Sequence, residues 1–330
     1  AQTMRGRRKR RSRRGLGIRP FRALAVDDDR RAVERSSWEL GKLVRRRNFA
    51  SVDEANAFLR QSLASQNPLS LPNETPADEA QALIYEAWEA PLRRRKQLAR
   101  RALELWPDCA DAYVLLGEDT ATVEEAKDLF EMGVRAGERA VGPEPFKEEG
   151  FPFWGAVETR PYMRALRRLA DALWMLGAHH QAIENFGRML RLNPSDNQGV
   201  RYILAGCLLA MGDDEALGAL LDQYPDDIGA ELTYARALWS FRQHGPSAAS
   251  RAALRAAIQR NPFVPLHLLE RRLPRRLPSS VGVGGEAEAI AFTAAVGPVW
   301  WSTEGAMEWL DRVFMAFVRN VVVRPLDVDS

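Results

Sequence analysis

Arginine and tryptophan side chains recur between residues 164 and 242 at spacings that suit recognition of a protein segment bearing carboxylates. An arginine guanidinium binds a carboxylate through two parallel hydrogen bonds, and a tryptophan ring supplies a large anchoring area at interfaces. The candidates are the residues expected to face one side of successive helices: Arg164, Arg167, Asp171, Trp174, Gln198, Arg201, Trp239 and Arg242. They predict an acidic peptide or a C-terminal carboxylate as the partner. The alternative is a solvated helix face whose arginines pair with the chain's own acids, for example with Asp171.

Residues that could perform catalysis form no recognisable constellation. His179 and His180 are adjacent, so they do not share a helix face as metal ligands four residues apart would. The glycine-rich stretch 281–286 follows no predicted strand, which favours a loop over a nucleotide-binding turn. The segment 158–162, in which Glu158 and Arg160 flank the entrance to the best repeat, is the one cluster that could hold chemistry, and the alternative there is an ion pair that pins the aromatic insert to the array. We therefore predict no enzyme, no cofactor and no metal.

The elements that must position the candidate residues are read from a repeat. Pro194 and Pro262 close similar phrases, FGRMLRLNP and LRAAIQRNP, and lie 68 residues apart, which is twice the 34-residue period of the tetratricopeptide helical hairpin. Gly177 and Gly245 fall where that repeat places its turn glycine. Proline ends a helix because it cannot donate the next backbone hydrogen bond, and Asp196 or Asn197 then caps the next helix.

The pattern divides the chain into six parts. They are a basic disordered tail (1–30), N-terminal helices with a proline-rich linker (31–76), degenerate helical repeats (77–136), an aromatic insert rich in glycine and proline (137–161), tetratricopeptide repeats (162–265) and a C-terminal helical cap (266–330). Within them we expect helices at 36–47, 52–64, 78–90, 93–105, 286–296 and 302–318. A cap is expected because the last apolar face of a repeat array otherwise meets water.

The insert contains four aromatic residues within nine positions: Phe146, Phe151, Phe153 and Trp154. Such a cluster either plugs the core of the array or forms an exposed apolar patch with a binding role.

Charge is concentrated at the N-terminus. Residues 1–20 carry nine arginines and lysines and no acid; removing these nine charges from the net charge of +3 leaves −6 for residues 21–330. Basic runs bind phosphate backbones by releasing counterions, so residues 5–14 predict nucleic-acid contact as one alternative. A solvated tail and a targeting signal are the others.

Cysteine and hydropathy patterns indicate a reduced, cytoplasmic protein. Cys109 and Cys207 lie in apolar helical contexts without the spacing of metal ligands or a disulfide framework. The longest apolar candidate, residues 289–301, is 13 residues long and is interrupted by Gly297 and Pro298, whereas a membrane-spanning helix needs about 18 or more residues. We therefore expect no membrane span.

Residues 163–264 resemble tetratricopeptide repeats, and a narrower resemblance appears towards the C-terminus. The phrases NPFVPLHLLE (261–270), LP (277–278), GEAEAIAF (285–292) and EGA (304–306) resemble the suppressor-of-tumorigenicity-seven family. The phrases GFPFWG (150–155), ETRPYMRA (158–165) and NPSDNQGVRY (193–202) resemble uncharacterised bacterial tetratricopeptide proteins. The resemblance covers residues 78–310 and implies a helical-repeat interaction protein without catalytic residues. Compared with peptide-clamp tetratricopeptide domains, Arg167 fits a basic clamp position, whereas Asp171 replaces the usual asparagine.

Together these patterns predict an all-α fold: a tetratricopeptide-like right-handed superhelix of antiparallel helix pairs with a C-terminal helical cap. The predicted function is non-catalytic protein–protein interaction, with a peptide or partner helix bound in the concave groove. The alternative is a nucleic-acid-associated factor that uses the arginine-rich tail.

Overall fold

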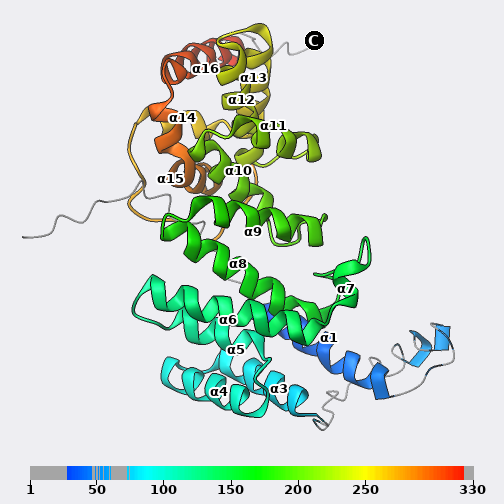
Figure 1. Cartoon of the computed structure of the whole chain (residues 1–330). Coiled ribbons are helices and arrows are strands. Elements are labelled where there is room, and N and C mark those ends of the chain that lie inside the picture. The colour runs from blue at the N-terminus through cyan, green and yellow to red at the C-terminus, as the bar shows by residue number, and fades with distance from the viewer. Residues whose placement is uncertain are drawn as a thin grey trace, which may run out of the picture.

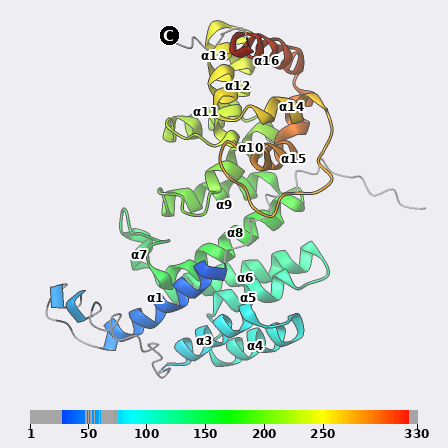
Figure 2. The same ribbon diagram turned by 180° about the vertical axis from the view of Figure 1, so that it is seen from behind.

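The computed structural model describes residues 28–46, positions 49, 51, 53, 54, 56–58, 60 and 73, and residues 75–322. Over this part of the chain every regular element is a helix (Figures 1 and 2). The all-α prediction is confirmed.

Within the described residues, five antiparallel helix pairs follow one another along the chain. Their first helices, called the A helices below, are α3 (Pro76–Glu89), α5 (Ala110–Glu118), α8 (Arg160–Met175), α10 (Val200–Met211) and α12 (Ala230–His244). Their second helices, the B helices, are α4 (Leu92–Leu105), α6 (Val123–Val141), α9 (His179–Leu192), α11 (Asp214–Gln223) and α13 (Ala248–Arg260). Each pair contacts the next, so the pairs form one stack from α3 and α4 at one end to α12 and α13 at the other (Figure 1).

The remaining elements lie around this stack. They are α1 (Asp28–Arg46), α7 (Glu144–Lys147), the 3-10 helix η1 (Val157–Thr159), α14 (Phe263–Leu269), α15 (Glu286–Ser302) and α16 (Ala306–Val322). Helix α1 lies beside the pairs at the N-terminal end of the stack, and α15 lies beside α10 in both views (Figures 1 and 2).

Local sequence explains why the pairs form. Gly177 turns the chain between α8 and α9 with a φ of +83°, a left-handed conformation that is unfavourable for residues with a Cβ atom. Helices α9 and α13 end at Leu192 and Arg260, two residues before Pro194 and Pro262. The carboxylate of Asp196 then accepts hydrogen bonds from the backbone N–H groups of Val200 and Arg201 at 2.7 and 3.0 Å, which caps α10.

Two apolar clusters are found among the described residues. The larger one runs from Val114 to Phe314 and joins α5, α6 and α8–α16. The smaller one lies in α3, α4 and α5 and is lined mainly by alanine, with Ile84, Leu98 and Leu115 as its large aliphatic residues. The N-terminal pair therefore has its own small core.

The aromatic insert behaves as a plug. Phe153 is 1% exposed, and Phe146, Phe151 and Trp154 are half-buried against the larger cluster. The Phe146 ring lies 5.0 Å from that of Phe153 and meets the Tyr162 ring edge-on at 5.3 Å. Of the two alternatives for this segment, the core plug describes the structure.

Several expected boundaries were wrong. Asp28–Arg30, expected in the tail, begin α1, where acidic residues are favoured by the partial positive charge of a helix N-terminus. Residues 137–141, expected in the insert, continue α6, because Gly137 allows that helix to approach Tyr162 closely. The predicted helix at 52–64 and the linker lie largely outside the described residues, as do residues 1–27.

The C-terminal cap also differs from expectation. Helix α15 passes through Pro298 and ends at Ser302 instead of stopping at 296. It packs on the A helices α10 and α12, whereas α16 packs on α13 and α14. Of these two helices, α16 therefore closes the end of the stack beside the last B helix, α13. Helix α15 instead covers part of the A-helix face, which was expected to be an open groove.

Candidate functional site

Arg164 is held by two carboxylates of the chain itself. Its Nε and Nη2 atoms donate to Asp111 on α5 at 2.7 and 2.6 Å, and its Nη1 lies 2.9 Å from a Glu34 oxygen on α1. Burial opposes the charged form of Arg164, but the two carboxylates outweigh it and raise the pKa of the guanidinium. Arg164 thus pairs with acids of its own chain in an internal clamp, as in the alternative drawn from the sequence, and binding of a partner's carboxylate there stays a prediction.

Helix α1 occupies the surface around this clamp. Glu34 is 7% exposed and also lies 3.3 Å from Nη1 of Arg160. Trp38, one turn further along α1, is buried with its ring 5.3 Å from that of Tyr85 on α3. Helix α1 thus contacts the A helices α3 and α8. We name the surface formed by Tyr85, Trp88, Asp111, Arg160 and Arg164 the α1 seat.

Three of the predicted site residues are buried. Nε of Arg167 donates to both carboxylate oxygens of Asp171 at 3.1 Å, and both residues are buried. Trp174 is 6% exposed, and its ring lies 4.3 Å from that of His179 with 37° between the two ring planes. The expectation that these three side chains face an open groove is wrong, because their helix α8 lies between neighbouring pairs and turns them into the core.

Arg201 forms a second internal clamp. It donates to Asp227 at 2.7 Å and to Asp196 at 2.9 Å, and it lies over the rings of Tyr202 and Tyr224 at 4.3 and 5.3 Å. Its Nη2 donates to the Tyr202 hydroxyl at 2.6 Å, so each of its three nitrogens donates to a group of the chain itself. Gln198, at the start of the same turn, is half-exposed. Arg201 therefore joins the loops that precede α10 and α12.

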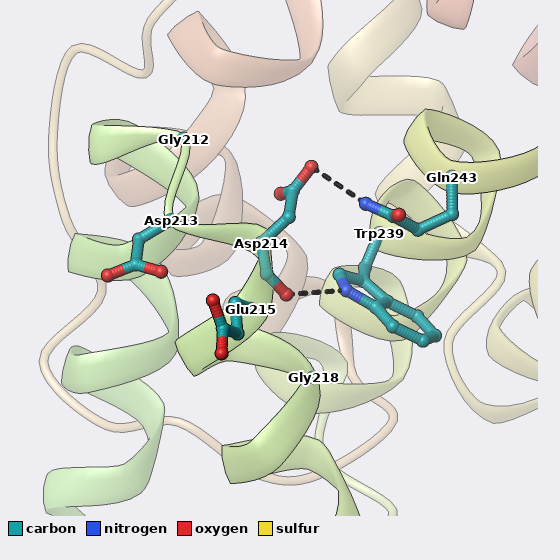
Figure 3. A pocket seen from close by; sticks show the side chains of 7 residues that line it. All are labelled: Gly212, Asp213, Asp214, Glu215, Gly218, Trp239 and Gln243. Atoms are coloured by element: carbon teal, nitrogen blue, oxygen red, sulfur yellow. Dashed lines mark hydrogen bonds between the residues drawn. The ribbon is translucent and has the colours of Figure 1, made fainter.

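Trp239 and Arg242 both contact Asp214 at the start of α11. The indole N–H donates to the Asp214 carbonyl at 2.8 Å, and Nη1 of Arg242 donates to its carboxylate at 3.2 Å. Arg242 also donates to Thr303 beyond α15 at 3.3 Å. Beside Trp239 an open pocket of about 480 Å³ lies between α11 and α12, lined by Gly212, Asp213, Asp214, Glu215, Gly218, Trp239 and Gln243 (Figure 3).

This pocket differs from the predicted groove in charge. Its rim carries Asp213, Asp214 and Glu215, and no arginine lines it. Asp213 accepts a hydrogen bond from Ala216 N–H and so caps α11, while Gln243 donates to Asp214 (Figure 3). An acidic rim beside an indole face suits a cationic side chain better than an acidic one.

Helix α15 packs against the A helices α10 and α12, in the C-terminal part of the stack. Glu288 is 2% exposed and accepts hydrogen bonds from the Ala230 N–H at 2.9 Å and from the Asn261 amide at 2.7 Å. Phe292 packs 5.4 Å from the Tyr234 ring. The A-helix face therefore carries two helices of its own chain, α1 and α15.

The segment 158–162 is used structurally. Arg160 pairs with Glu34 and donates to the Trp154 carbonyl at 2.8 Å, so it fastens the insert through a backbone group, and Glu158 is exposed. Burial raises the pKa of the Tyr162 hydroxyl. The expected pinning of the insert occurs, but the acid paired with Arg160 comes from α1, more than a hundred residues away.

Sequence reasoning did not find Glu34, Asp111 or Arg160 as parts of a binding surface. Asp111 precedes Tyr113 at a helix start and looked like an ordinary first-turn acid, and Glu34 lay in a segment without a repeat signal. The spacing of Glu34 and Trp38, four residues apart on one helical face, was the available signal. The basic stretch 5–14 lies outside the described residues, and nucleic-acid contact there stays a prediction.

Among the residues that the structure describes, no group of three or more histidine, cysteine or acidic side chains is arranged to hold a metal ion. None of the described helices combines the length and the apolar character needed to cross a bilayer.

Comparisons with known proteins place these features in context. No protein-family model matches the chain. It is 29% identical over 264 residues to the Suppressor of tumorigenicity 7 protein-like of Homo sapiens, covering 72% of this chain and 46% of that protein. It is 28% identical over 282 residues to the Suppressor of tumorigenicity 7 protein of Macaca fascicularis, covering 78% and 52%. The chain thus spans about half the length of these relatives.

Among solved structures, YrrB, described as a TPR protein with an unusual peptide-binding site, aligns with a TM-score of 0.40. The sequence identity is 21%, and the alignment covers 56% of this chain and 84% of that chain. From its helix pairs and its sequence relatives, the chain is a tetratricopeptide-like helical-repeat protein that is similar to the Suppressor of tumorigenicity 7 proteins.

Proposed function

We propose that this protein is a non-catalytic scaffold that binds a segment of a partner protein along its A helices. The observation that carries the proposal is that this face already holds two helices of the chain, α1 and α15, through side chains. A surface that seats helices through buried arginine–carboxylate pairs and aromatic contacts has the chemistry of a helix-binding groove.

The accessible part of this face differs from the eight residues expected from the sequence. Arg167, Asp171 and Trp174 are buried, and Arg201 and Arg242 are paired with internal carboxylates. Trp239 remains half-exposed at a pocket whose rim is open to solvent. We therefore propose this pocket as the place where a partner segment extends past α15, with a basic side chain against the indole.

A photo-crosslinking amino acid at position 243 tests the proposal. Gln243 is exposed at the pocket rim, so the replacement leaves the core intact. The expected result is a defined protein adduct, identified by mass spectrometry, that is lost when Trp239→Ala is added. The matched control places the same amino acid at Arg255, which is exposed on the B helix α13. Equal labelling from both positions, or none from position 243, would contradict the proposal.

A further inference from the structure

Helix α1 is bound to the stack unlike any other helix around it. Among its described side chains, the buried ones are Glu34, Trp38 and Lys42, which are spaced four residues apart on one face. Lys42 lies over the Trp38 ring at 4.0 Å and donates to Asn73 at 3.1 Å. Val33, on the outer side, is 65% exposed. Among the described side chains of α1, one aromatic ring and two charged groups are thus the buried part of the attachment.

Helix α15 provides the contrast. Its buried side chains are mostly apolar, and Phe292 and Trp300 are both fully enclosed in the larger cluster. Releasing α15 would expose that apolar surface to water, which is strongly unfavourable. Of the described buried side chains of α1, release would expose one indole and two charged groups that water solvates well. Helix α1 therefore resembles a bound ligand more than a part of the core.

The two arginines of the α1 seat carry one more positive charge than Asp111 neutralises, so the seat favours a bound helix that brings a carboxylate. Arg160 and Arg164 bring two positive charges, and Asp111 and Glu34 bring two negative ones. Without Glu34 the seat holds an uncompensated guanidinium charge in a partly buried place, which is costly until another acid pairs with it. The aromatic rings of Tyr85 and Trp88, 5.3 Å apart and edge-to-face, supply the neighbouring apolar contact.

We propose that the α1 seat is a recognition site for an amphipathic helix that carries a glutamate and, four residues later, an aromatic residue, and that α1 occupies it as a tethered ligand. This rests on the proposed function and names a partner class for a different part of the same face. A partner helix binds by displacing α1. Because α1 is in the same chain, a competitor works against an effective concentration on the order of millimolar.

The test uses the full chain and a fluorescent peptide of residues 28–46. In the variant Glu34→Gln with Trp38→Ala, α1 loses both anchors and the seat is freed. In the unchanged chain α1 competes with the peptide for the seat, and loss of the buried Trp38 indole weakens the attachment of α1 by a factor of about ten or more. We therefore expect the peptide to bind the variant at least about tenfold more tightly than it binds the unchanged chain. A peptide carrying the same two substitutions should not bind. The control variant Val33→Ala should behave as the unchanged chain does.

Equal peptide affinity for the two chains, or no binding to a variant whose thermal unfolding matches that of the unchanged chain, overturns the proposal.

Hydrogen exchange of the unchanged chain gives a second readout that needs no variant. Backbone amides of α1 should exchange at least about tenfold faster than those of α8, and protection as strong as that of α8 would also overturn the proposal. A concentration-dependent dimer that exchanges α1 between copies would make a second copy the occupant and reject the partner helix. Crosslinking at position 243 reports on a separate surface, so failure of the seat and failure of the scaffold function are distinguishable.

Discussion

Arg164 joins its own helix to three others through one guanidinium group. It lies on α8 and binds Asp111 on α5 and Glu34 on α1, and its guanidinium also lies 5.0 Å from the Trp88 ring on α3. Substituting Asp111 or Glu34 takes one of two carboxylates from a partly buried guanidinium, which is more costly than removing an exposed ion pair. The same side chain can therefore look like a partner-binding arginine in the sequence and act as a structural one in the fold.

Glu231 should make stability depend on pH. Burial raises its pKa from an ordinary 4.5 to about 7, and the nearby carboxylates of Glu288 and Asp227 act in the same direction. Between pH 4.5 and 7 the folded chain keeps a proton that the unfolded chain has released, so the free energy of unfolding should fall as pH rises through this window. Below 4.5 and above 7 this group should have no further effect.

Chemical denaturation at a series of pH values measures this contribution. The variant Glu231→Gln carries an uncharged amide of nearly the same shape, so its free energy of unfolding should lack this decline and exceed that of the unchanged chain above pH 7. Parallel profiles for the two proteins would show that Glu231 keeps an ordinary pKa.

Helices α6 and α8 approach each other at Gly137 more closely than any residue with a Cβ atom would allow. A Cβ atom built on Gly137 would lie 2.8 Å from the Cβ of Tyr162 and 2.9 Å from its Cα, so backbone would have to move. This contact fixes the position of the N-terminal part of α8, which contains Arg160 and Arg164 of the α1 seat. The geometry of the seat thus depends on a glycine that is not part of it.

Gly137→Ala should lower the free energy of unfolding by about 1–3 kcal/mol, the usual cost of overpacking a close contact. The matched control is Gly187→Ala in α9, where the added Cβ would meet only the end of the Arg191 side chain at 3.4 Å. This control should raise stability by about 0.5–1 kcal/mol, because alanine favours a helix more than glycine does. Urea titrations of both variants measure the difference, and a Gly137→Ala protein as stable as the control would refute the close-packing argument.

The whole molecule is a stack whose two ends differ in their cores. The C-terminal pairs share one large cluster with α14, α15 and α16. The pair α3 and α4 has a small cluster lined mainly by alanine, and a terminal pair has a neighbouring pair on one side only. Stability in such arrays is roughly a sum of each repeat and its interfaces, so the N-terminal pair should be the weakest part.

Hydrogen exchange followed by mass spectrometry tests this expectation. Backbone amides in α3 and α4 should exchange at least about tenfold faster than those in α10 and α12, because local opening there exposes less apolar surface. The Glu34→Gln, Trp38→Ala chain should widen the gap, since α1 contacts α3 through Trp38. Uniform protection across the stack would mean that the chain opens as a single cooperative unit instead.

The helix pairs could be predicted because their signals are local. The turn at Gly177 and the helix ends before Pro194 and Pro262 depend on backbone conformations within one 34-residue repeat, and those conformations follow from the residue type. The insert was harder, since aromatic residues favour burial and binding equally; packing of Phe153 against Tyr162 decided between them.

What covers the A helices could not be predicted, and the physical reason is distance along the chain. Arg164 and Glu34 are 130 residues apart, and the Ala230 N–H and Glu288 are 58 residues apart. An amphipathic pattern shows that a helix face will bury arginine and tryptophan side chains, but it carries no information on whether the carboxylate or ring opposite belongs to the same chain or to another. Periodicity therefore fixed the helices and their faces, and only the folded chain showed that α1 and α15 already lie on them.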